Sequence, residues 1–314
     1  MAVAAEGAAY DVLVVGGTGV DTIVLVDELG VPEGDSRSVP PIRDYVAHSG
    51  NGVALGFHAL GLATAFIDFL GEDVQGRMIL ERYAATGLDF HHLPAPAGTP
   101  RSVNLVDREG RRFSFYDGRH PLDLRLPREF YLPHVERARH VHISRSAHAE
   151  PVFADAVRLG RTVSTDLHAW DGEEASALPW ALGADLVFLS AAAVGERIPE
   201  VMRRILAEGR ASLVVATDGA AGCHVLERGE PVPRRFPAVA PERPVVDSNG
   251  AGDAFLTAFL HRRFSGAPLE ECVLAGAVSG AFACGSPGTH EELIGAPELA
   301  AAVARAARAR TAAG

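Results

Sequence analysis

The sequence predicts an α/β fold in which helices cover both faces of a mainly parallel sheet and a small β-rich lid is attached. Short β-branched apolar runs alternate with helix-like stretches along most of the chain, an order typical of parallel βαβ units. Two segments interrupt this order and resemble strands of a small, half-exposed sheet. We therefore expect one domain over residues 8–300, lid segments at about 22–46 and 100–117, and a helical tail at 301–314.

The expected core strands are short and rich in valine, isoleucine and leucine. The first, residues 11–15, is followed by a Gly-Gly pair, which indicates a buried strand running into a tight loop. A strand is also expected at 245–246, just before a glycine-rich turn. The other core strands are expected at 64–67, 140–143, 162–164, 185–189 and 212–216, and helices at 76–86, 151–160, 199–208 and 254–264.

Both lid segments alternate apolar and polar residues. The pattern is clearest in Phe113-Ser114-Phe115-Tyr116, and turn signals such as Arg108-Glu109-Gly110 separate the expected strands. Such alternation suits a sheet with one face open to water or to a ligand. The aromatic side chains of Phe115 and Tyr116 would either stack on a ligand or pack the core of the lid.

The composition excludes several classes of protein. The 314 residues are 47% hydrophobic and 22% charged, with a formal net charge of −11, whereas a nucleic-acid-binding surface needs concentrated positive charge. No apolar run is long enough to cross a bilayer, and the N-terminus lacks the pattern of a signal peptide, so we expect a cytoplasmic protein without a membrane partner. Cys223, Cys272 and Cys284 are too widely spaced to suggest a disulfide framework or a zinc site.

The chain contains no lysine, and all 29 basic residues are arginine. This excludes a Schiff-base lysine and the phosphate-binding lysine of P-loop enzymes and protein kinases. Any phosphate chemistry must therefore use other positive groups, such as backbone amides at the start of a helix.

The run that carries the chemistry lies at residues 245–255, Val-Val-Asp-Ser-Asn-Gly-Ala-Gly-Asp-Ala-Phe. The backbone N–H groups of Gly250, Ala251 and Gly252 can converge at the start of the following helix, where the helix dipole favours an anion. Asp253 falls in the first helical turn and suits the role of a base that accepts the proton of an attacking hydroxyl. The alternative is a well-capped helix start, because aspartate there also favours stability alone.

Residues 247–255 resemble the D-T-x-G-A-G-D-x-F signature of the ribokinase-like (PfkB) family of carbohydrate and nucleoside kinases. The resemblance implies a three-layer α/β/α core with a β lid. It also implies ATP with Mg²⁺ as cofactors, and a homodimer formed through the lid. Asp253 would be the catalytic base above an anion hole made by Gly250, Ala251 and Gly252.

The glycine-rich run at residues 15–21 looks like the first strand and loop of that family, whose aspartate holds substrate hydroxyls. The resemblance makes Asp21 the leading substrate contact. A dinucleotide-binding turn is the alternative, but the run lacks a third glycine at the required spacing and an acidic partner after the next strand.

Three further positions are expected to contact substrate on the same resemblance. Gly50 and Asn51 fall in the family's G-G-x-x-x-N-x-A segment, where Gly52 occupies the place of the asparagine and Asn51 lies one residue earlier. Asn104 matches a lid position that faces substrate. The alternatives are a purely structural turn for the first two, and a solvent-facing strand residue for Asn104.

The nucleotide is expected against residues 217–222, which resemble the family's T-x-G-x-x-G turn. Thr217, Gly219 and Gly222 are the expected contacts, together with Ser190 at the end of the strand before. Residues 190–193 read Ser-Ala-Ala-Ala where the family usually has N-x-x-E, an element that helps to organise Mg²⁺ and phosphate. How this chain holds the metal is therefore open.

Other charged or polar residues have possible roles beside the nucleotide. Asp166 would either join the shell of waters around the metal or cap its strand, and Arg145 would supply charge to phosphate or lie on the surface. The resemblance also suggests a monovalent cation, K⁺, near Asp247 and Asn249.

We therefore predict an ATP-dependent phosphotransferase that acts on a hydroxyl of a small sugar. A nucleoside kinase is the alternative with the same fold. A ligand-binding or regulatory homologue with weak catalysis is a third hypothesis, because the N-x-x-E element is missing.

Overall fold

The computed structural model describes residues 9–30 and 33–313, in which the strands are short, as the apolar runs predict. The strands are β1 (Tyr10–Val15), β2 (Gly19–Leu25), β3 (Arg43–Ala47), β4 (Thr64–Leu70), β5 (Asp89–Pro94), β6 (Arg101–Val106), β7 (Arg112–Asp117), β8 (Ala138–Ile143), β9 (Thr162–Asp166), β10 (Leu186–Ser190), β11 (Leu213–Thr217), β12 (Cys223–Glu227) and β13 (Arg234–Phe236).

Helices separate most of the core strands. They are α1 (Ser49–Ala59), α2 (Val74–Thr86), α3 (Arg128–Arg137), α4 (Val152–Arg158), α5 (Leu178–Gly183), α6 (Ile198–Glu208), α7 (Ala251–Phe264), α8 (Leu269–Ala283) and α9 (Ala296–Ala313). Short 3₁₀ helices lie at Ala147–Ala149, Ala175–Ala177, Ala191–Ala193, Gly195–Arg197 and Gly219–Ala221.

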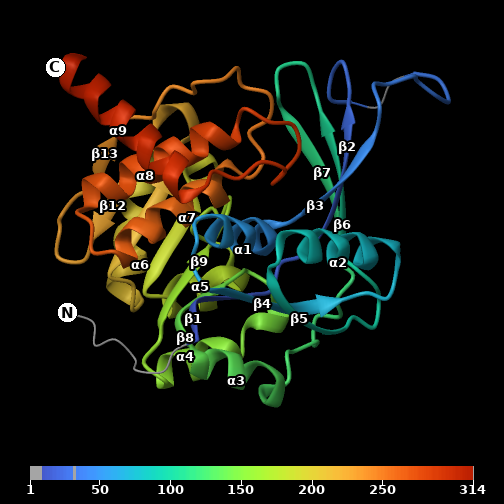
Figure 1. Cartoon of the computed structure of the whole chain (residues 1–314), viewed down its shortest axis with the longest axis horizontal. Coiled ribbons are helices and arrows are strands. Elements are labelled where there is room, and N and C mark those ends of the chain that lie inside the picture. The colour runs from blue at the N-terminus through green and yellow to red at the C-terminus, as the bar shows by residue number, and fades with distance from the viewer. Residues whose placement is uncertain (1–8, 31–32, 314) are drawn as a thin grey trace.

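The strands of the described residues form a large sheet and a small one, which Figure 1 shows as a layered core with the lid at the upper right. The large sheet has the order β13-β12-β11-β10-β9-β8-β1-β4-β5. Its strands from β11 to β5 are parallel, and β12 and β13 are antiparallel to their neighbours. The small sheet has the order β3-β2-β6-β7. The predicted α/β core with a β lid is confirmed.

Two hydrophobic cores cover the two faces of the large sheet. Successive residues of a strand point to opposite faces, so Leu13 of β1 packs with α3 to α6, whereas Val12 packs with α1, α2, α7 and α8. Trp180 of α5 is nearly fully buried in the first core and Phe259 of α7 in the second. This arrangement is the three-layer core (Figure 1).

The parallel strands all end at one edge of the sheet, which places the polar residues after them together. β9, β10 and β11 are adjacent, and Ser190 at the end of β10 pairs with Thr217 at the end of β11. In open α/β sheets, ligands bind outside the carboxyl ends of the strands. The lid arises at the same edge, because β2 follows β1 after a loop of three residues.

One sequence prediction is wrong. Residues 245–246, expected as a strand, form an irregular segment in which Val245 is 65% and Val246 56% exposed. The N–H of Val246 donates to the carbonyl of Cys284 after α8, at 2.8 Å, instead of to a sheet. An apolar pair exposed in this way lies outside both cores, so its β-branched side chains find no sheet to join.

Two further findings concern the cysteines and the membrane. Cys223 and Cys272 are buried and Cys284 is half-buried, all as free thiols. Among the helices of the described residues, none combines the length and the apolar character needed to span a bilayer.

Candidate active site

A cleft of about 1070 Å³ lies at the carboxyl edge of the large sheet and extends to the lid. Its wall brings together residues from β2, the ends of β9, β10 and β11, the start of α7 and one side of α8. Of the residues singled out from the sequence, those that line it are Asp21, Asp166, Ser190, Thr217, Gly219, Gly222, Gly250, Ala251, Gly252 and Asp253.

Helix α7 begins directly at the cleft. Gly250 precedes it with φ 74°, a left-handed conformation that favours glycine, and a Cβ there would overlap the carbonyl oxygen of Thr289. The first N–H groups of a helix have no partner within the helix and are available to an anion. A Cβ on Gly252 would meet nothing within 4 Å, so the helix start is open towards the cleft. Asp253, in the first turn, is 8% exposed.

Asp21 of β2 lies across the cleft, at the base of the lid. Its Oδ2 accepts a hydrogen bond of 3.2 Å from Thr289. Among the described residues, none has a donor aligned for a hydrogen bond to Oδ1, although Nε2 of His48 lies 3.5 Å away. A buried carboxylate oxygen without a donor is suited to accept one from a ligand hydroxyl.

The pKa of Asp21 reflects these contacts. Burial by itself raises it, but the neighbouring His48 ring and polar contacts with Ser102 and Thr289 outweigh burial. The net result is a pKa below the usual value for an aspartate, so Asp21 carries a negative charge at neutral pH.

The half of the cleft in which the sequence predicts the nucleotide lies over β10 and β11. Ser190, Thr217, Gly219 and Gly222 line it, and Gly222 adopts φ 101° where a Cβ would overlap the carbonyl oxygen of Phe236. Small residues of α8, at Ala277, Gly280 and Ala281, form the facing wall together with Cys284 just after the helix.

Asp166 at the end of β9 is a second acidic group in the cleft, near Asp253. Burial is the main cause that raises the pKa of Asp166, and the negative charge of Asp253 raises it further, against the opposing effect of His168. Its Oδ1 accepts the backbone N–H of His168 at 2.8 Å. Two carboxylates that face one cleft are suited to a divalent cation with oxygen ligands.

Five residues expected at the site do not form part of the cleft wall: Gly50, Asn51, Asn104, Asp247 and Asn249. Gly50 is buried against the loop after β1, Asn51 has no exposed surface, and Asn104 is 2% exposed on the lid. Asp247 accepts hydrogen bonds of 2.9 and 3.2 Å from the backbone and side-chain amide of Asn249.

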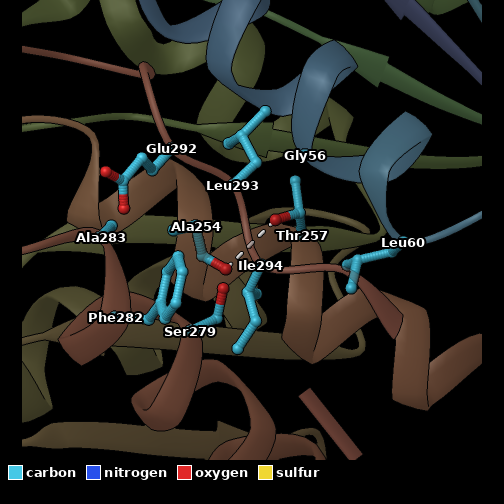
Figure 2. A pocket seen from close by; sticks show the side chains of 10 residues that line it. All are labelled: Gly56, Leu60, Ala254, Thr257, Ser279, Phe282, Ala283, Glu292, Leu293 and Ile294. Atoms are coloured by element: carbon cyan, nitrogen blue, oxygen red, sulfur yellow. Dashed lines mark hydrogen bonds between the residues drawn. The ribbon is translucent and has the colours of Figure 1, made fainter. Parts of the chain in front are cut away.

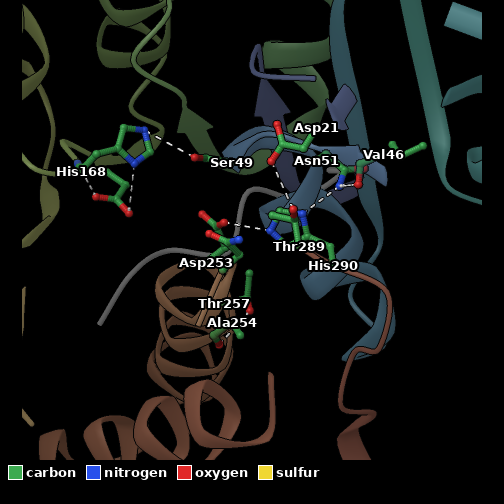
Figure 3. A network of polar contacts seen from close by, with 12 residues as sticks. Asp21, Val46, Ser49, Asn51, His168, Asp253, Ala254, Thr257, Thr289 and His290 are labelled. Atoms are coloured by element: carbon green, nitrogen blue, oxygen red, sulfur yellow. Dashed lines mark hydrogen bonds and ion pairs between the residues drawn. The ribbon is translucent and has the colours of Figure 1, made fainter. Parts of the chain in front are cut away.

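Asn51 belongs instead to a buried network beneath Asp253, which Figure 3 shows with His290 at its centre. His290 Nε2 lies 2.9 Å from Asp253 Oδ2, and His290 Nδ1 lies 3.0 Å from Asn51 Nδ2. Asn51 Nδ2 also lies 3.2 Å from the carbonyl oxygen of Val46. The ring of His290 is 4% exposed.

Sequence reasoning missed four residues of the site: His48, Arg112, Thr289 and His290. Arg112 of the lid lines the cleft and donates to Asn249 Oδ1. The alternation that predicts the lid contained a signal for it, since Arg112, Ser114 and Tyr116 share one face of β7. His48, Thr289 and His290 stand in irregular segments or at a helix start, where no spacing marks them.

Arg145 and the two aromatic residues of the lid take other places. Arg145 donates to Glu174 at 2.5 and 2.6 Å and does not line the cleft. The ring of Tyr116 lies 5.6 Å from that of His48, whereas Phe115 points to the opposite, outer face of the lid. Phe115 and Tyr116 therefore lie on opposite faces of the lid and cannot stack on the same ligand.

A separate pocket between α1, α7 and α8 has a volume of only about 10 Å³ (Figure 2). Its wall contains Thr257, which donates to the carbonyl oxygen of Ala254 at 3.1 Å. Room for about one water molecule excludes a substrate there. The large cleft is therefore the candidate active site.

The chain resembles known proteins along nearly its whole length. The model of the pfkB family carbohydrate kinases matches residues 10–294. The acarbose 7(IV)-phosphotransferase of Actinoplanes sp. is 50% identical over 281 residues, covering 89% of this chain and 94% of the relative. A nucleoside kinase of Methanothermobacter thermautotrophicus is 27% identical, covering 94% and 95%.

The solved structure of the microbiome-derived acarbose kinase Mak1 is 46% identical, with a TM-score of 0.88, and covers 94% of this chain and 99% of its own. These similarities confirm the predicted phosphotransferase that acts on a hydroxyl of a small sugar. The chain belongs to the pfkB family of carbohydrate kinases.

Proposed function

We propose that this protein transfers the γ-phosphoryl group of ATP to a hydroxyl of acarbose, with Asp253 as catalytic base. The identity of 50% to an acarbose phosphotransferase over 89% of the chain is the observation that carries the substrate assignment. The 46% identity to a second acarbose kinase supports it independently.

The position of Asp253 supports its role as base. Its carboxylate lines the cleft beside the open start of α7, so a hydroxyl that it deprotonates would lie next to a phosphoryl group held by the amides of Gly250, Ala251 and Gly252. Phosphoryl transfer depends mainly on positioning and on stabilising charge. Backbone amides supply that charge in a chain without lysine.

ATP would occupy the half of the cleft lined by Ser190, Thr217, Gly219 and Gly222, and the sugar the half near Asp21. The buried, charged Asp21 would accept a substrate hydroxyl at Oδ1. Gly50, Asn51 and Asn104 would act from below the surface, by shaping the cleft.

Asp166 fits an Mg²⁺ ion bound through water and nucleotide phosphates, because its carboxylate faces the cleft beside Asp253. When bound, Mg²⁺ neutralises charge on the phosphates. The oxygens expected to bind a monovalent cation already accept hydrogen bonds. Asp247 accepts from Asn249, and Asn249 Oδ1 accepts from Arg112. The residues at that place are therefore engaged with one another and fit a monovalent cation poorly.

Coupled measurement of ATP consumption and sugar phosphate tests the proposal, with acarbose, ribose, fructoselysine and adenosine offered separately. We expect kcat/KM to be greatest for acarbose. A preference for adenosine would instead identify a nucleoside kinase, and tight binding of a sugar without turnover would identify a binding protein.

Replacing Asp21 by asparagine is expected to raise KM for the sugar about 10- to 100-fold, because a hydrogen bond to a charged acceptor contributes roughly 1.5–3 kcal/mol. KM for ATP should change little. Asp44→Asn is the matched control, since Asp44 is an exposed lid aspartate that pairs with Thr22. Equal effects of the two variants on KM would contradict a direct contact at Asp21.

We also propose that two copies pair through the outer face of the lid. Val103, Phe113 and Phe115 share that face and are 37%, 54% and 58% exposed. Clustered exposed apolar side chains mark interaction surfaces. Light scattering should give a dimer for the wild-type protein and a monomer for Phe115→Glu. Val232→Glu, at an exposed site off the lid, should stay dimeric, and a monomeric wild type would refute the pairing.

A further inference from the structure

We infer that His290 is a positioning residue that fixes the carboxylate of Asp253 through one neutral tautomer, which Asn51 selects. The inference deepens the proposed function, because it rests on Asp253 as the base. The contacts run from Val46 and Tyr83 through Asn51 and His290 to Asp253, all of them buried or half-buried within the described residues. Figure 3 shows the part of this series of contacts that lies nearest the cleft.

The side chain of Asn51 has one possible orientation. Its Nδ2 donates to the carbonyl oxygen of Val46 at 3.2 Å, and its Oδ1 accepts from the hydroxyl of Tyr83 at 3.0 Å. A flipped amide would set Oδ1 against the Val46 carbonyl, two acceptors without a proton between them. The backbone of β3 therefore decides which atom of Asn51 faces His290.

The hydroxyl of Tyr83 is held as a donor to Asn51. Burial raises the pKa of Tyr83 far above its usual value, so it keeps its proton. Since that single proton goes to Asn51 Oδ1, the hydroxyl of Thr18, 2.7 Å away, donates to Tyr83. The N–H of Thr18 in turn donates to Asp68 at 2.8 Å. These buried bonds agree with the orientation that the Val46 carbonyl sets for the amide of Asn51.

The tautomer of His290 follows from Asn51. The second proton of Asn51 Nδ2 points at His290 Nδ1 across 3.0 Å, so Nδ1 must accept and carry no proton. The remaining proton of the neutral ring lies on Nε2, which donates to Asp253 Oδ2 at 2.9 Å.

The glycine at position 52 makes room for this ring. A Cβ on Gly52 would overlap the imidazole of His290. The sequence departs from the family pattern at this position, where an asparagine is usual, and the structure fills the vacated space with a histidine from the loop after α8. Gly52 and His290 are therefore matched to each other.

The two oxygens of Asp253 therefore have different roles. Nε2 of His290 occupies Oδ2 and fixes the plane of the carboxylate. Oδ1 is left to accept the proton of the sugar hydroxyl. A misplaced catalytic group can lower a rate about 100-fold, so the loss of this orientation should appear in kcat.

The tautomer is tested by long-range ¹H–¹⁵N correlation spectra of protein labelled with ¹⁵N-histidine, the His290 signals being those that disappear in His290→Gln. We expect a protonated Nε2 and an unprotonated Nδ1 in the folded protein. A protonated Nδ1, in either the other tautomer or the imidazolium, would overturn the inference.

Kinetics test the positioning role. His290→Ala should lower kcat about 10- to 100-fold and leave KM for ATP unchanged. His290→Gln, whose amide can still donate to Asp253, should restore most of kcat. His140→Ala is the matched control: it also removes a buried histidine, from β8 away from the cleft, and should lower stability while kcat at a permissive temperature is retained.

The outcomes separate this inference from the proposed function. If Asp253→Asn loses activity but His290→Ala does not, the inference alone fails. If Asp253→Asn keeps the wild-type rate, the assignment of the base fails and the positioning role with it. If His290→Ala and His290→Gln lose kcat equally, or if His140→Ala loses as much as His290→Ala, the effect is structural and the positioning role is overturned.

Discussion

Asp253→Asn is expected to lower kcat by about 10²- to 10⁴-fold, the usual contribution of a general base. The asparagine keeps the size of the side chain and can still accept from His290, so the cleft should keep its shape. An amide cannot take up the proton of the attacking hydroxyl, however. KM for ATP and for the sugar should therefore change much less than kcat.

Steady-state rates measured with saturating ATP and sugar check this expectation. Asp155→Asn is the matched control, because Asp155 is also 8% exposed but lies on the opposite side of the sheet, bound to Arg128, Arg158 and Tyr131. It should lose stability and keep kcat. Turnover by Asp253→Asn at the wild-type rate would exclude Asp253 as the base.

The protein is expected to lose stability steeply as the pH falls below about 6.5, the ordinary pKa of histidine. Burial lowers the pKa of His140 and of His142 to about 3, with repulsion between charged rings as a smaller cause for His142. Both rings share the hydroxyl of Ser164, at 2.7 and 2.9 Å, and have no aqueous access to stabilise a charge.

The direction of the change in stability follows from how many protons the folded and unfolded chains bind. Between pH 6.5 and 3 the unfolded chain binds protons at these two rings and the folded chain does not, so acidification favours unfolding. Each ring should cost up to about 1.4 kcal/mol per pH unit in that window, and the cost disappears above it.

Denaturant unfolding at a series of pH values measures this loss. His140→Gln should reduce the slope of the free energy of unfolding against pH by about one histidine, because glutamine cannot be protonated. An unaltered slope in His140→Gln would show that this ring does not stay neutral in the folded state.

The sequence was most informative where a local pattern reflects a local cause. The apolar runs predicted β1, β4, β8, β9, β10 and β11 because a strand buried on both faces must be apolar throughout. The run at Gly250 to Asp253 predicted the helix start at the cleft, because glycines and a first-turn aspartate are favoured there by backbone conformation and dipole alone.

The strand expected at residues 245–246 failed for a related reason. Two β-branched residues satisfy the local propensity for a strand, but β-propensity describes the fit to a half-buried pleated surface. Val245 and Val246 meet no such surface, since the segment runs along the end of α8 and leaves both side chains largely exposed.

His290 could not be anticipated from its neighbours. It is separated from Asn51 by 239 positions and from Asp253 by 37, and it stands in a loop without periodicity. The departure at Gly52 was visible in the sequence, but what fills the space above a glycine depends on which segment the fold brings there.

The sequence by itself thus predicted the kind of chemistry at the start of α7: an anion cradle of backbone amides with an aspartate beside it, in a chain that has no lysine to hold phosphate. Only the tertiary structure decided how that aspartate is held. The orientation of Asp253 depends on a buried histidine whose tautomer is set by Asn51 and the carbonyl of Val46, groups that only the packing of α1, β3 and the loop after α8 brings within hydrogen-bond distance.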